Sequence, residues 1–120
     1  MGRELSPKYY SNPVDLWNRK NASYLEMQQH FRVINVRYED LLVDIAPVLS
    51  TLEGKFVLTR KSAGFVNVEH STQNVRKTYY DYRDYYLREQ WKNQLSDQAI
   101  TIIRGEIDQD VSRTFGHEIL

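Results

Sequence analysis

The sequence has no cysteine, which excludes disulfide bonds, thiolate catalysis and cysteine zinc sites. Its five glycines form none of the Gly-rich motifs that cradle phosphates. No two of its three histidines are spaced as a helical pair of zinc ligands, so we expect no metal site. No apolar run approaches the roughly 18 residues that span a membrane, and the N-terminal residues lack the apolar stretch of a secretory signal. We therefore expect neither a membrane span nor secretion.

An excess of charge of one sign is also missing, because 16 Lys and Arg balance 16 Asp and Glu. Without a global field, charge gives no preference for nucleic acid or an anionic membrane, and we expect neither as a partner. The 41% hydrophobic and 27% charged residues are typical of a globular chain. A compact domain of 14.3 kDa buries about two-thirds of its surface. The composition thus predicts one soluble, cytoplasmic domain with a modest core.

The first third of the sequence contains one helix signal and one strand signal. Residues 1–11 are polar and are expected to be irregular. Asn12 followed by Pro13 is a favourable helix start, and the apolar spacing predicts a helix over residues 13–29. Residues 32–38 are rich in β-branched side chains, with apolar residues on both alternating faces. This pattern predicts a strand that is covered on both sides, as in a mostly parallel sheet.

Acidic residues follow the predicted strand. Glu39 and Asp40 place two carboxylates at the positive N-terminal end of a predicted helix. Two carboxylates can act as general acid and base, but this position favours capping and interaction with the helix dipole. Asp44 is expected to cap a further helix that ends near Gly54. Residues 56–58 are predicted to form a short strand.

The sequence of the second half of the chain predicts a loop followed by two helices. Residues 59–74 mix basic and small polar residues, which predicts a long loop. Residues 78–92 are densely aromatic and are predicted to be helical. Ser96 is expected to cap a last helix over residues 97–113, which ends near Gly116.

The predicted loop carries the best candidate for anion binding. Arg60 and Lys61 are adjacent, in a stretch that contains Gly64. An Arg can offer a bidentate fork and a Lys a point charge to the same phosphate. The alternative is that both side chains are simply solvated loop charges.

Several segments together resemble a known family. Residues 36–44, Val-Arg-Tyr-Glu-Asp-Leu-Leu-Val-Asp, resemble a segment of sulfotransferases that use 3′-phosphoadenosine 5′-phosphosulfate (PAPS). Residues 12–21 are similar to the preceding helix of bacterial-type sulfotransferase domains, and residues 82–87 with Trp91 are similar to their C-terminal helices. The resemblance covers residues 12–118, following the irregular segment 1–11, and it concerns the C-terminal half of the family only.

The resemblance implies a fold, a cofactor and a function. The implied fold class is α/β: the C-terminal half of a P-loop-type sulfotransferase fold, mainly helical, with one central parallel-type strand at about residues 32–38. The implied reaction transfers a sulfuryl group from PAPS to a hydroxyl or amine acceptor. In the family the 5′-phosphosulfate loop and the catalytic base lie upstream, so we assign no catalytic residue and expect the lone chain to be inactive. Arg60 and Lys61 are the implied cofactor-binding residues.

Other functions remain open at this point, and so does the question of whether the chain is an enzyme. The first alternative is a non-catalytic protein-interaction module, because a half-sheet leaves an edge and an apolar face uncovered. Its partner would be a complementing N-terminal half or a second copy of the chain. A weaker alternative is binding of single-stranded nucleic acid through the aromatic residues of 78–92.

Overall fold

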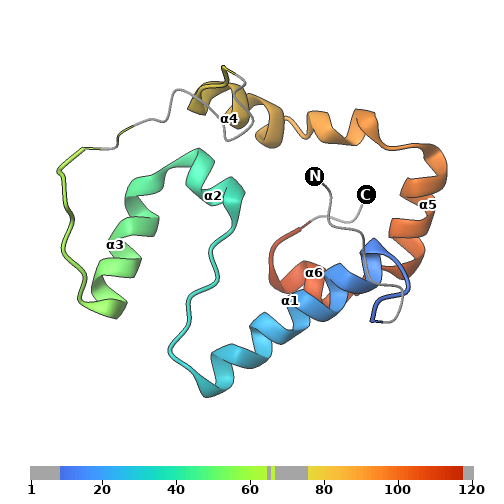
Figure 1. Cartoon of the computed structure of the whole chain (residues 1–120), viewed down its shortest axis with the longest axis horizontal. Coiled ribbons are helices and arrows are strands. Elements are labelled where there is room, and N and C mark those ends of the chain that lie inside the picture. The colour runs from blue at the N-terminus through green and yellow to red at the C-terminus, as the bar shows by residue number, and fades with distance from the viewer. Residues whose placement is uncertain (1–8, 65, 67–75, 118–120) are drawn as a thin grey trace. The chain divides into compact units, whose positions relative to one another are not determined.

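The structure, a computed structural model, describes residues 9–64, 66 and 76–117. The chain divides into two compact units, of which the first comprises residues 1–35 and 95–120 and the second residues 36–94. All regular secondary structure in the described part is helical (Figure 1). The predicted α/β fold with a central parallel-type strand is therefore wrong.

The strand prediction fails because the described part of the chain offers residues 32–38 no strand to pair with. Residues 32–37 form no regular secondary structure, although the backbone is extended at Phe31, just before them, and at Arg37, the last of them. Within the described residues, the backbones of Ile34, Asn35 and Val36 take part in no hydrogen bond. β-Branched residues favour an extended backbone. A strand of a sheet also needs a neighbouring strand whose backbone donates hydrogen bonds to it and accepts hydrogen bonds from it.

The first unit contains α1 (Pro13–His30), α5 (Asp97–Glu106) and α6 (Gln109–Thr114). Figure 1 shows α5 and α6 beside α1, and α1 packs against both. The predicted N-cap is confirmed, since the Asn12 side-chain oxygen accepts hydrogen bonds from the backbone N–H groups of Val14 and Asp15. These bonds satisfy two donors that the start of a helix leaves open.

The helix predicted over residues 97–113 is divided in two. Ser96 caps α5 as predicted, accepting a hydrogen bond from the backbone N–H of Ala99 at 3.2 Å. The helix then ends at Glu106, and Asp108 caps α6 by accepting hydrogen bonds from the next turn. A strong capping residue inside an apolar repeat thus starts a new helix. The predicted end near Gly116 is confirmed, with φ of 70° at this glycine.

The second unit contains α2 (Tyr38–Val43), α3 (Ile45–Phe56), α4 (Tyr79–Leu87) and the 3₁₀-helix η1 (Gln90–Gln94). Helix α2 packs against α3 and α4, and α4 packs against η1. The helix starts predicted after the extended segment are confirmed within one residue, and the Asp44 side chain caps α3.

Two predicted boundaries in this unit are wrong. Gly54 lies inside α3, and Phe56 is the last residue of this helix rather than part of a strand. The helix ends because Val57 adopts the left-handed conformation, with φ of 54°. The predicted aromatic helix stops at Leu87, because Glu89 also has a positive φ, of 52°. Part of the predicted loop, residues 65 and 67–74, lies outside the described residues.

The core is much smaller than the composition predicts. Of the apolar side chains in the described part, only Leu42 and Val111 are buried, with 3% and 8% of their surface exposed. The small polar residue Ser112 is fully buried beside Val111. The large apolar side chains that are exposed are Tyr9, Tyr24, Met27, Phe31, Val36, Tyr38, Val43, Val57, Leu58, Val66, Tyr80 and Ile102. Among the described residues, no helix is both long and apolar enough to span a bilayer.

Candidate protein-interaction surfaces

The C-terminal end of α1 displays exposed apolar side chains, here called the apolar stripe, formed by Tyr24 and Met27 of the helix and by its C-cap residue Phe31. Tyr24 and Met27 are three residues apart on one face of the helix, Phe31 follows directly after the last helical residue, and the three are 36%, 42% and 66% exposed. This is the pattern of anchors by which an amphipathic helix enters an apolar groove of a partner. The sequence pattern did not single out Met27 or Phe31, and Phe31 lies just beyond the end of α1.

The first half of α1 is fixed to the other helices of the first unit. The Asn18 side chain joins α1 to the junction between α5 and α6, through Glu106 and Asp108. The rings of Trp17 and His117 lie in a T-shaped arrangement with their centroids 6.0 Å apart. One end of α1 is therefore anchored, while the apolar stripe lies at the other end.

In the second unit, a carbonyl at the end of α2 holds α4 in place. The backbone oxygen of Leu42 accepts hydrogen bonds from the Tyr79 hydroxyl and from Nε of Arg83, the latter at 3.0 Å. Carbonyls in the last turn of a helix lack a donor within the helix, and a cation there also complements the helix dipole. Both bonds are made to the backbone of Leu42, and the Leu42 side chain is the one buried apolar side chain among the described residues of this unit.

A group of rings, here called the tyrosine cluster, lies along this helix pair. The edge of Tyr86 meets both Tyr38 and Tyr85 with centroids 5.1 Å apart, and the rings of Tyr79 and Tyr80 meet at 5.5 Å. Tyr80 is 72% exposed and Tyr38 46%. Tyrosine is enriched in protein interfaces, because its ring offers a large contact area and its hydroxyl a hydrogen bond. The cluster thus has the composition of a binding surface.

The hydroxyl of Tyr38 is held in its protonated form. Burial raises the pKa of Tyr38, and the neighbouring Tyr86 and Tyr82 raise it further. An ordinary tyrosine is already neutral at physiological pH, so the raised pKa leaves Tyr38 able to donate a hydrogen bond.

Next to α3, two aliphatic side chains are displayed on a turn. Val57 is 86% exposed and Leu58 57% exposed. Just beyond them, Arg60 makes a bidentate ion pair with Glu53, with Nε–Oε1 and Nη2–Oε2 distances of 2.5 and 3.0 Å. This pair ties the segment after α3 back to the helix, and so holds the apolar turn on the surface.

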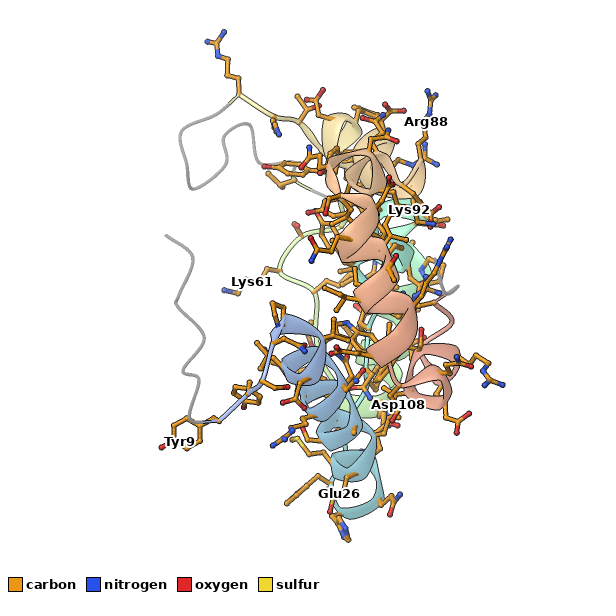
Figure 2. All side chains as sticks on the ribbon, turned by 90° about the vertical axis from the view of Figure 1, so that its right-hand side faces the viewer. Tyr9, Glu26, Lys61, Arg88, Lys92 and Asp108 are labelled. Carbon is orange, nitrogen blue, oxygen red and sulfur yellow. The ribbon has the colours of Figure 1, made fainter. Side chains whose placement is uncertain are left out.

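The two predicted cofactor-binding residues lie in different environments. The fork of Arg60 is occupied by Glu53, and this hydrogen bond raises the pKa of Arg60. Lys61 projects away from the segment that follows α3 (Figure 2), and it forms no ion pair with any described residue. A phosphate could reach Lys61 directly but would have to displace Glu53 from Arg60. Their role in binding PAPS stays a prediction.

The adjacent acidic residues Glu39 and Asp40 lie in the first turn of α2, where their charges complement the helix dipole, but no side chain caps this helix by a hydrogen bond. Glu39 is 3.9 Å from Nε of Arg37. Across the described ranges, no group of three His, Asp or Glu side chains gathers in a way that could hold a metal ion.

No family model, no curated protein and no solved structure matches this chain.

Proposed function

We propose that the chain is a non-catalytic protein-interaction module whose folding is completed by a partner. The observation that carries this proposal is the imbalance between buried and exposed apolar side chains in the described part, where only Leu42 and Val111 are buried. Isolated helices of fewer than about 12–15 residues are marginally stable in water and gain stability mainly from packing. Helices α2, α4, α5 and α6 have ten residues or fewer each, and they therefore depend on such packing for their stability.

The apolar stripe of α1 and the tyrosine cluster are the surfaces that we assign to binding. The stripe offers a helix face with regularly spaced anchors, and the cluster offers rings with hydroxyl groups. Burial of an exposed side chain such as Phe31 contributes on the order of 1.5–3 kcal/mol. The partner is a complementing protein or a second copy of the chain.

The proposal is tested on the isolated chain by light scattering after size exclusion and by the fluorescence of a dye that binds apolar surface. We expect either self-association or strong dye binding. The variant Met27→Ser/Phe31→Ser should lower that signal, because it removes two anchors of the stripe. The control Gln28→Ser/Gln29→Ser changes two polar residues of the same helix turn. A monomer that binds no dye, or a dye signal equal in both variants, contradicts the proposal.

A sulfotransferase-family function with PAPS as the donor is a second proposal. It is supported by the resemblance of residues 36–44 and by the exposed ammonium group of Lys61. It predicts that the chain binds 3′-phosphoadenosine 5′-phosphate and that Arg60→Ala/Lys61→Ala weakens this binding, measured by calorimetric titration. Absent binding, or binding equal in the variant, removes the cofactor role of these residues. Turnover by the lone chain would contradict the expectation that the chemistry lies elsewhere.

A further inference from the structure

A different kind of site lies in the first unit, where the segment before α1 meets the first turns of that helix. An open hollow of about 490 Å³ is present there, and its lining residues are Tyr9, Tyr10, Leu16, Arg19, Lys20 and Ser23. This volume falls within the range of small-molecule sites. We propose that the hollow binds a small organic anion that carries a flat apolar ring, such as an aryl phosphate.

The wall of the hollow is tied to α1 by polar contacts. Nε of Arg19 lies 2.8 Å from Oδ1 of Asp15, and the other carboxylate oxygen accepts a hydrogen bond from the backbone N–H of Ser11 at 3.0 Å. A longer contact, of 3.5 Å, joins Nη1 of Arg19 to the carbonyl of Tyr9. The segment before α1 is thus fastened to the helix without a ligand.

The charges around the hollow leave a net positive site. The hydrogen bond from Ser11 lowers the pKa of Asp15, and Arg19 lowers it further, so this carboxylate is ionised and balances the Arg19 guanidinium. Lys20 forms no ion pair with a described residue, and its ammonium group can donate three hydrogen bonds. The Ser23 hydroxyl is already directed to the Lys20 carbonyl, at 2.7 Å. An anion is therefore held chiefly by Lys20, with Nη2 of Arg19 as a second donor.

The remaining lining is apolar and aromatic. The rings of Tyr9 and Tyr10, together with Leu16, can contact the face of a flat ring, and ring stacking favours aromatic over aliphatic ligands. A ligand with both an anionic group and a ring uses both halves of the lining. Phosphate alone or a neutral ring alone uses only one of them.

The test is a titration of the full chain with phenyl phosphate, with inorganic phosphate and with phenol. Calorimetry measures the affinity for each compound, and NMR of the backbone amides locates the binding site. We expect phenyl phosphate to bind at least about tenfold more tightly than either partial probe, since each lacks a charge-assisted bond or a ring contact. Amide shifts should be concentrated at residues 9–23.

Variants separate the two contributions. Lys20→Gln should weaken phenyl phosphate binding roughly five- to tenfold, because one charge-assisted hydrogen bond is lost. The matched control Lys77→Gln makes the same change of charge in the second unit and should leave binding unchanged. Tyr10→Leu should weaken binding, whereas Tyr10→Phe, which keeps the ring, should not.

The proposal is overturned if phenyl phosphate does not bind, if inorganic phosphate binds equally well, or if Lys20→Gln behaves like Lys77→Gln. None of these results bears on dye binding or self-association, so the proposed interaction function is tested separately.

Discussion

The side-chain amide of Asn18 bridges the end of one helix and the start of the next through Glu106 and Asp108. Its Nδ2 donates to the carbonyl of Glu106 and its Oδ1 accepts from the backbone N–H of Asp108, both at 2.8 Å. Helix ends leave such backbone groups without partners in the helix. One polar side chain of α1 therefore positions both α5 and α6.

The substitution Asn18→Ala should destabilise the first unit by about 1–3 kcal/mol, because it removes two hydrogen bonds that contribute roughly 0.5–1.5 kcal/mol each. Denaturant unfolding followed by circular dichroism measures the change. The control is Asn21→Ala, since the Asn21 amide bonds only to the carbonyl of Trp17 within α1. Equal effects of the two substitutions would show that the bridge contributes nothing.

The Leu42 carbonyl provides a similar test in the second unit. Arg83→Ala removes the hydrogen bond from Nε. It should lower the free energy of unfolding by about 1 kcal/mol or more, because the Leu42 carbonyl loses a charged donor. Arg88→Ala is the control, because Arg88 makes only an exposed ion pair with Asp84, which is worth little. If the two variants unfold at the same denaturant concentration, Arg83 does not hold α4 on α2.

Stability should fall in acid partly through Asp81. Its carboxylate accepts hydrogen bonds from the backbone N–H and the hydroxyl of Thr78, at 2.7 and 2.9 Å, and they lower its pKa below 3.8. A lowered pKa means that the folded chain binds the proton less tightly than the unfolded chain does. The stabilisation is therefore present above pH 3.8 and is lost as the pH falls through the folded-state pKa.

This dependence is measured as the difference in unfolding midpoint between pH 7 and about pH 3. Asp81→Asn should reduce the difference. The control Asp97→Asn changes the first turn of α5, where the carboxylate accepts no hydrogen bond within the described residues. An unaltered pH dependence in Asp81→Asn would refute the role of this cap.

Local capping chemistry could be predicted from the sequence. Asn12, Asp44 and Ser96 each start a helix where expected, because the acceptor side chain and the donors it satisfies lie within three residues of one another. The spacing of apolar residues could likewise predict helices, although a strong cap such as Asp108 divides one of them.

Features that depend on distant partners could not be predicted. The strand expected at 32–38 fails, since the sequence specifies extended backbone but not the strand that must pair with it. The Asn18 bridge and the donors to the Leu42 carbonyl join residues far apart in the sequence, so no local pattern marks them. The availability of Arg60 depends on Glu53, and only the structure shows that its fork is occupied.

Amide hydrogen exchange in the isolated chain tests the central claim most directly. In a chain that depends on a partner, the most protected amides should be those of α2 and α6 near Leu42 and Val111. Even these should exchange through openings whose free energy is well below the roughly 5–15 kcal/mol needed to unfold an ordinary domain. If a contiguous set of amides exchanges only through global unfolding in that range, the chain has a full core of its own and the account is wrong.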